Sequence, residues 1–299
     1  MRWQGKRRSS NVEDRRGQRV SAGGGGGIAT LLMRFLPFLL QTKIGRILLI
    51  VGVVGYFGAQ MLGVNIAPQQ SSEQQIPANT QLTEQQQHLG EFVAVILADT
   101  EDTWHKLLQQ QQKSYREPVL VLFTQAVQSA CGTASAAVGP FYCPGDEQLY
   151  IDLSFYEDLK TRHGAPGDFA QAYVIAHEVG HHLQKVLGTT TKVRQAQQGV
   201  SKTEANKLSV KLELQADCYA GVWGYYAHNE RDMLEAGDLE EALTAAAAIG
   251  DDRLQKQAQG RVTPDSFTHG SSEQRVRWFR RGFDSGDYLQ CNTFGGANL

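Results

Sequence analysis

Two histidines four residues apart, with a glutamate directly after the first, are the side chains of this 299-residue chain best suited to chemistry. They are His177, Glu178 and His181, in the segment HEVGH. On a helix, residues four apart differ by about 40° in direction, so both imidazoles can reach one tetrahedral metal ion. Glu178 lies beside that face, where a carboxylate can accept a proton from a metal-activated water and return it to a leaving group. The spacing therefore predicts a metal-binding helix.

A third ligand is expected further along the chain, because a catalytic zinc binds three protein ligands and keeps one position open for water. Glu213 and Asp217, in ELQAD, are carboxylates four apart on another predicted helix. We interpret Glu213 as the third ligand and Asp217 as the acceptor of the free ring N–H of a ligand histidine. The alternative is a solvated helix face, which the pair would favour without HEVGH. One catalytic Zn2+ is the predicted cofactor.

The segment HGSSEQR contains two further cationic side chains, His269 and Arg275, either of which could stabilise a developing oxyanion. The alternative, which we favour, is a helix start capped by Ser271 or Ser272.

Charge is distributed unevenly along the chain. Residues up to Arg46 contain ten Lys or Arg and two acids, whereas the remainder has a net charge of about −10. Such an acidic remainder is unsuited to a polyphosphate, so no nucleic-acid partner is expected. The stretch Ile47 to Val64 has no charged residue and is long enough to cross most of a ~30 Å hydrocarbon core.

The flanks of that stretch predict its orientation, because Lys and Arg stay on the cytoplasmic side and none occurs between Ile47 and His105. A retained anchor is favoured over a cleaved signal peptide, since the apolar stretch begins unusually late. The alternative is a buried helix of a soluble fold. We therefore expect a single-pass protein of the inner (cytoplasmic) membrane, with a cytoplasmic N-terminus and a periplasmic or otherwise extracytoplasmic domain.

Composition and apolar spacing divide the chain into four regions. These are a basic cytoplasmic tail (1–46) with a Gly-rich run and an interfacial apolar segment (28–40), a transmembrane helix (47–64), a Gln/Ser/Pro-rich linker (65–82) and a folded domain (83–299). Within that domain the spacing predicts helices over 84–112, 168–187, 204–228, 238–257 and 271–283, and strands over 119–123 and 148–153. This pattern is typical of a helix-rich α+β fold.

Four cysteines, an even number, would meet an oxidising compartment in an outward-facing domain. Cys131 and Cys143 could close a short loop, which would leave Cys218 and Cys291 to tie the C-terminus to the Glu213 helix. The alternative is reduced, buried thiols. Zinc binding by these cysteines is not expected, because no CxxC pair occurs.

The segments YVIAHEVGHHLQ and ELQADCYAGVW together resemble a bacterial family of neutral zinc metallopeptidases. The segments MRWQGKRRSSNVEDRRG, CGTASAAVGPFYCPGDEQLYIDLSFY and HGSSEQRVRWF also match that family, so the resemblance covers nearly the whole chain, without departure at the metal positions. More broadly, HExxH followed by ExxxD is similar to gluzincins. That similarity implies a zincin-like domain with an active-site helix under a small sheet, whose edge strand pairs with extended substrate. Residues 149–153 are the candidate edge strand, with an interior strand as the alternative.

The resemblance implies a membrane-anchored zinc metalloendopeptidase that uses Glu178 as general base and acid. Its partners would be a protein or peptide substrate and the lipid bilayer. Two alternatives stay open: a membrane-tethered chaperone or assembly factor with a structural zinc, and a zinc hydrolase acting on a bond other than the peptide. The natural substrate does not follow from the motifs.

Overall fold

A mixed four-stranded sheet packed against helices forms the part of the chain that the computed structural model describes, residues 1–18 and 82–296. The sheet order is β1 (Val12–Asp14), β2 (Val119–Phe123), β6 (Gln148–Asp152) and β5 (Phe141–Cys143). The first three strands run parallel, and β5 is antiparallel to β6. A separate hairpin joins β3 (Ala126–Ser129) to β4 (Gly132–Ser135).

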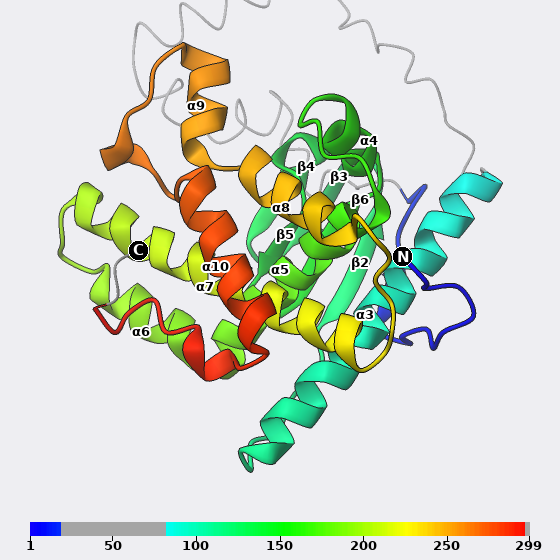
Figure 1. Cartoon of the computed structure of the whole chain (residues 1–299). Helices are drawn as coiled ribbons and strands as arrows, with labels where there is room; N and C mark the ends of the chain where they lie inside the picture. The colour runs from blue at the N-terminus through cyan, green and yellow to red at the C-terminus, as the bar shows by residue number, and fades with distance from the viewer. Residues whose placement is uncertain (19–81, 297–299) are drawn as a thin grey trace, which may run out of the picture. The chain divides into compact units, whose positions relative to one another are not determined.

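The helices confirm the predicted helix-rich α+β class (Figure 1). They are α3 (Glu84–Gln110), α4 (Ser154–Thr161), α5 (Asp168–Val186), α6 (Thr189–Ala196), α7 (Lys202–Asn229), α8 (Asp238–Ala248), α9 (Asp251–Gln259) and α10 (Ser272–Ser285). Short 3-10 turns follow β4 (η1, Ala136–Val138), α9 (η2, Pro264–Ser266) and α10 (η3, Tyr288–Gln290).

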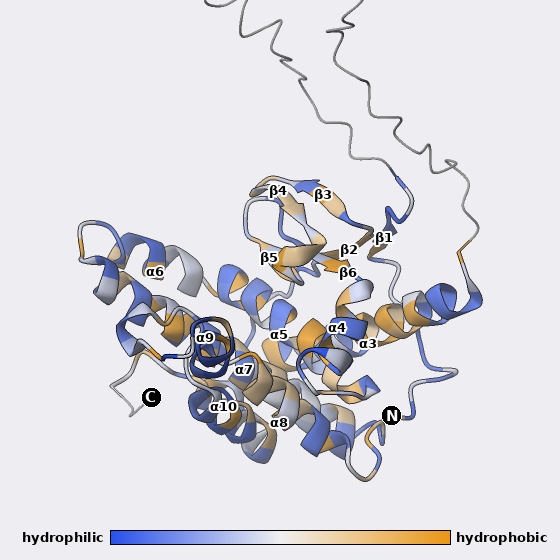
Figure 2. Cartoon of the chain, turned by 90° about the horizontal axis from the view of Figure 1, so that it is seen from above, coloured by the Kyte–Doolittle hydropathy of each residue, from blue (hydrophilic) through white to orange (hydrophobic). Residues whose placement is uncertain are grey.

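Helix α5 is the centre of the domain. It contacts α3, β5 and β6 on one side and α7 and α8 on another, and α10 packs along α7. Figure 2 shows the strands on one side of α5 and helices α7, α8 and α10 on the other. Burial on so many sides explains why its apolar residues, such as Phe169, Ile175 and Val179, are fully enclosed. The helix that carries HEVGH is therefore held by the whole core.

One predicted helix is wrong in extent: residues 238–257 form two helices, α8 and α9, rather than one. The break falls at Gly250, where a Cβ would overlap the backbone nitrogen of Ser272 at the start of α10. Directly after it, the backbone N–H of Asp251 donates to the carbonyl of Gly270, 2.9 Å away. The approach of the loop before α10 thus forces the chain to turn.

The predicted edge strand is also corrected. Residues 149–152 of that segment belong to β6, which lies between β2 and β5, so the interior alternative is the right one. The edge strand beside α5 is β5. Its three residues lie between Pro140 and Pro144 and are too few to show an alternating pattern.

Residues 1–18, which the charge pattern assigns to a free tail, instead belong to the folded domain. Val12, Glu13 and Asp14 pair with Leu120, Val121 and Leu122 of β2 as a parallel strand. Trp3 is only 7% exposed and packs edge-on against Phe92 of α3, with ring centroids 5.3 Å apart. The predicted tail therefore contributes a strand and part of the core.

The predicted transmembrane helix (47–64), the interfacial segment (28–40) and nearly all of the linker (65–82) lie outside the described residues. Among residues 1–18 and 82–296, no helix has the length and hydropathy that a bilayer crossing requires. The described residues resume at Leu82, and the next side chain, Thr83, caps α3 by accepting the N–H of Gln86.

Both disulfides join the pairs considered from the sequence, Cys131 with Cys143 and Cys218 with Cys291. Cys131–Cys143 fastens the β3–β4 hairpin to the edge strand β5, and Cys218–Cys291 fastens the C-terminal segment to α7. Disulfides persist in oxidising compartments, so they favour an extracytoplasmic location for this domain.

Helices α7 and α10 approach so closely that two glycines are required at their contact. A Cβ on Gly282 would overlap the carbonyl oxygen of Cys218, and one on Gly221 would overlap that of Phe279. We expect Gly282→Ala to lower the free energy of unfolding by about 3 kcal/mol, because neither backbone can move aside. Gly224→Ala is the matched control, since the nearest atoms to its Cβ would belong to the side-chain rings of Phe283 and Phe169 rather than to backbone. Urea denaturation compares the two, and equal losses would contradict the backbone overlap.

Candidate metal centre

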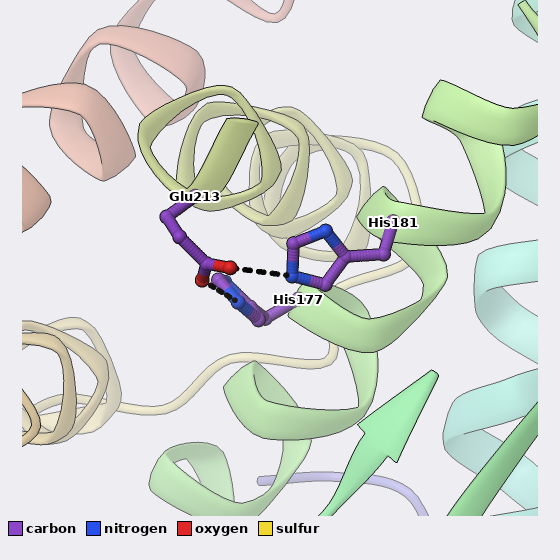
Figure 3. A group of neighbouring side chains, drawn as sticks. All are labelled: His177, His181 and Glu213. Atoms are coloured by element: carbon purple, nitrogen blue, oxygen red, sulfur yellow. Dashed lines mark hydrogen bonds and ion pairs between the residues drawn. The ribbon is translucent and has the colours of Figure 1, made fainter. Parts of the chain in front are cut away.

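Three side chains converge between α5 and α7: His177 and His181 from α5 and Glu213 from α7 (Figure 3). The Glu213 carboxylate lies between the two imidazoles, with Oε2 3.2 Å from His177 Nε2 and Oε1 3.5 Å from His181 Nε2. All three ligand atoms lie within 4.8 Å of one another. The sequence-predicted ligand set is thus brought together at one point.

The other ring nitrogen of each histidine already has a partner. His177 Nδ1 lies 2.8 Å from Asp217 Oδ1, and His181 Nδ1 lies 3.0 Å from the side-chain oxygen of Gln184. Both partners accept hydrogen bonds, so each histidine keeps a proton on Nδ1, and loss of the second proton leaves the Nε2 lone pair facing Glu213 and free to bind a metal. Two imidazole nitrogens and a carboxylate facing one point fit the donor set of a zinc ion that keeps an open position.

Asp217 is held by a buried network behind the ligands. It is fully buried and receives two hydrogen bonds of 2.9 Å from the Arg275 guanidinium, and the Tyr173 hydroxyl donates to it across 2.5 Å. Arg275 is itself only 2% exposed. Charge compensation by Arg275 lets Asp217 stay ionised in the core while it orients His177.

The titration of these groups follows the same contacts. Burial alone would lower the pKa of His177, but the Asp217 carboxylate and Glu213 outweigh it and raise that pKa to about 9. Burial would raise the pKa of Asp217, yet Arg275 and then His177 lower it overall. Likewise the two histidines outweigh burial and hold the pKa of Glu213 well below its usual range. A metal ion must displace the proton of His177, so metal affinity should rise with pH.

Gly180, inside HEVGH, allows α5 and α7 to meet beside the ligands. A Cβ there would lie 3.0 Å from Ala216 Cα and from its carbonyl oxygen. Helices with small residues at their contact can bring their backbones closer than larger side chains allow. The close approach of α7 therefore explains why a glycine stands in this helix.

The ligands open onto a cleft of about 740 Å³. Residues 136–142, which include η1 and the first two residues of the edge strand β5, line one part of it, and α7 and the His269 loop line another. Glu178 lines the same cleft and is 8% exposed. His177 and His181 are 7% and 19% exposed in their side chains, so the ligand atoms are partly open to this space.

The two cations of HGSSEQR separate in the structure. His269 reaches the cleft and is half-exposed, whereas the Arg275 guanidinium is engaged by Asp217 and Tyr173. The favoured capping interpretation also holds, because Ser271 caps α10 by accepting the N–H of Gln274. Arg275 thus holds Asp217 in place. It lies 58 residues after Asp217 in the chain, so the sequence does not indicate this role.

Sequence reasoning also missed the side chains around the ligands. Gln184 has no sequence signal beyond its place one turn after His181, and Tyr173 has none beyond its place one turn before His177. His182 points away from the ligands, as its spacing predicts, and Nε2 lies 2.6 Å from the Arg116 carbonyl while Nδ1 lies 3.1 Å from the Tyr142 hydroxyl. The first bond fastens α5 to the segment before β2, and the second fastens it to the edge strand β5.

Comparison with known proteins agrees with this geometry. Residues 1–294 match the family described as "Putative neutral zinc metallopeptidase". The chain belongs to this family. The match includes the segment 1–18 as well as both helices that carry the candidate ligands, so the family is defined over the domain described above and not over HEVGH alone.

Two related proteins show how far the similarity extends along the chain. The chain is 54% identical to YpfJ of Escherichia coli (strain K12) over 296 residues, which cover 99% of each protein. It is 44% identical to Rv2575 of Mycobacterium tuberculosis (strain ATCC 25618 / H37Rv) over 206 residues, 66% of this chain and 67% of that protein. No solved structure matches the chain.

Proposed function

We propose that this protein is a zinc-dependent peptidase, attached to the inner membrane by the apolar stretch Ile47–Val64, whose folded domain works outside the cytoplasm. The observation that carries the proposal is the convergence of His177, His181 and Glu213 in a cleft that Glu178 also lines. The chain's family and the two disulfides support the reaction class and the compartment.

Each residue of the site has a separate role in the proposed reaction. A zinc ion held by His177, His181 and Glu213 would supply Lewis acidity to the scissile carbonyl and to the attacking water. Glu178 accepts the proton of that water and later donates it to the leaving amine. Asp217 keeps the proton of His177 on Nδ1, which leaves Nε2 available as a ligand. This arrangement is gluzincin-like in its ligand set.

The edge strand offers a place for an extended peptide. Among the described residues strand β5 pairs only with β6, so its other backbone edge can form main-chain hydrogen bonds with a substrate strand. Residues 136–142 lie along the cleft, and among them Val138 is 65% exposed. An exposed valine at the cleft suits contact with an apolar substrate side chain.

His269 is the proposed stabiliser of the oxyanion. Asp251 organises its loop by accepting the backbone N–H groups of Thr268, His269 and Gly270, and its Oδ1 lies 3.2 Å from His269 Nδ1. This hydrogen bond raises the pKa of His269, so the imidazole stays protonated to a higher pH and can donate to a developing negative charge.

Removing that carboxylate should shift the pH dependence of hydrolysis. We expect Asp251→Asn to lower the pKa of His269, so the alkaline limb of the kcat/KM profile moves to lower pH. The stabilisation of the fold by the His269–Asp251 interaction follows the same sign. Because the pKa of His269 is raised in the folded state, the interaction contributes fully to stability below the unfolded pKa of about 6.5. That contribution is lost as the pH rises through the folded pKa. In a His269→Gln background the substitution should no longer move the limb. A shift that persisted there would assign the limb to another group.

Metal content and hydrolysis together test the proposed function. The purified full chain should contain one zinc ion per molecule and cleave casein, a chelator should abolish cleavage, and added zinc should restore it. Zinc at full stoichiometry without cleavage of casein or of cell-wall peptides would instead favour a chaperone or assembly factor with a structural zinc. Cleavage of a non-peptide bond alone would favour the other hydrolase.

A further inference from the structure

We infer that residues 1–18 and the metal-bearing domain lie on the same side of the membrane, which is incompatible with a single crossing by Ile47–Val64 between them. The inference concerns topology and is independent of whether the domain hydrolyses peptides. It replaces the cytoplasmic placement of the N-terminus that the charge pattern predicts.

Backbone hydrogen bonds join the N-terminal segment to the domain along its length. Arg2 N donates to Met233 O across 2.7 Å, Ser9 N to Ala94 O across 2.9 Å, and Arg15 N to Leu122 O across 2.8 Å. In the other direction Leu120 N donates to Asn11 O across 2.8 Å. The segment is thus anchored to α3, to β2 and to the loop after α7.

A buried carboxylate on α3 depends on this segment. Glu101 is 1% exposed, and its side chain lies 2.5 Å from Ser9 Oγ, 2.9 Å from Asn11 Nδ2 and 3.0 Å from Arg7 Nη2. Within the described residues these are its hydrogen-bond partners, and all three belong to the N-terminal segment. Because an ionised carboxylate cannot stay buried without partners, α3 and residues 7–11 must fold as one unit.

The basic residues of the segment are matched to acids and carbonyls. Arg2 pairs with Asp232, Arg7 with Glu101 and Asp102, and Arg8 with Glu91. Lys6 donates to the carbonyl of Arg231. Within the segment itself, Arg15 pairs with Glu13 and Arg16 with Asp14. Arg16 also donates to the carbonyl of Gln86 on α3, so five of these six cations have partners on the acidic domain. These positive charges are explained by contacts with the folded domain, so they are no longer evidence that the segment is a cytoplasmic tail.

The distances leave no room for a bilayer. Neighbouring strands such as β1 and β2 lie about 4.8 Å apart, whereas the hydrocarbon core is about 30 Å thick. The two disulfides belong to the same folded unit as residues 1–18, so the shared compartment is the oxidising one outside the cytoplasm. Both segments are therefore extracytoplasmic.

Cysteine labelling of the full chain in its own membrane tests the inference. All four native cysteines are in disulfides, so a single added thiol is labelled selectively. Ser10→Cys reports on the N-terminal segment and Ser114→Cys on the domain, since both serines are exposed. Gln4→Cys provides a second N-terminal position, also exposed, should Ser10→Cys fold poorly. Spheroplasts and detergent-opened cells are treated with a membrane-impermeant maleimide, with a cytosolic thiol protein as leakage control.

We expect Ser10→Cys and Ser114→Cys to be labelled equally in intact spheroplasts. Equal protection of both until the cells are opened would also keep them on one side, and would move the shared compartment to the cytoplasm. Labelling of Ser114→Cys alone in intact spheroplasts would overturn the inference. Because labelling needs no turnover, failure here is distinguishable from failure of the proposed peptidase activity.

Discussion

Glu178→Gln is expected to reduce peptide hydrolysis by about 10²–10⁴-fold, the range for removal of a general acid–base group, while zinc remains bound. The amide cannot accept the proton of the attacking water, and it preserves the size of a side chain that is 8% exposed. Casein cleavage and zinc content, measured on the same preparations, separate loss of chemistry from loss of metal.

Two other substitutions serve as controls for this result, one expected to remove zinc and one expected to have no effect. Glu213→Gln should lose zinc and hydrolysis together, because Glu213 lies between both ligand histidines. Glu204→Gln should change neither, since its side chain is 56% exposed on the first turn of α7. Undiminished hydrolysis by Glu178→Gln would rule out its role as proton carrier.

Arg275→Met is expected to lower the free energy of unfolding by about 3–5 kcal/mol, because it leaves Asp217 buried without its cationic partner. Arg275 holds the pKa of Asp217 down, so its loss also favours a neutral Asp217 that orients His177 less well. Zinc affinity should fall by about 10–100-fold, as for other groups that orient a metal ligand. Urea denaturation and competition with a zinc chelator measure the two effects.

Arg277→Met is the matched control, two residues further along α10 and exposed. A surface substitution of this kind should change stability by less than about 0.5 kcal/mol. Equal effects of the two substitutions would mean that α10 tolerates no methionine, and would refute a specific role for the Arg275–Asp217 pair.

The parts of the fold that the sequence predicted are those with a strong period or a fixed spacing. Helix α5 ends within one residue of its predicted limit, and β2 matches at both ends, because apolar residues recur along each. HEVGH and ELQAD likewise identified the ligand helices, since four-residue spacing places two side chains on one face.

The unpredicted parts depend on contacts between distant segments. Strand β1 consists of Val12, Glu13 and Asp14, whose charges hide its pairing with β2. The turn at Gly250 follows from the approach of Ser272, and the function of Arg275 follows from its meeting with Asp217. None of these has a local signature, because in each case the partner lies more than twenty residues away.

The Cys218–Cys291 bridge has a consequence for how the protein matures. It closes a loop of 73 residues that contains α8, α9 and α10, and it begins one residue after Asp217. By chain entropy, closing a loop of this length contributes about 4 kcal/mol to stability. Once the cysteines are oxidised, the bridge ties the segment after α10 to α7 beside Asp217. A chain whose cysteines are still reduced lacks that contribution, so we expect the region around the candidate metal ligands to reach its full stability only after the bridge has formed.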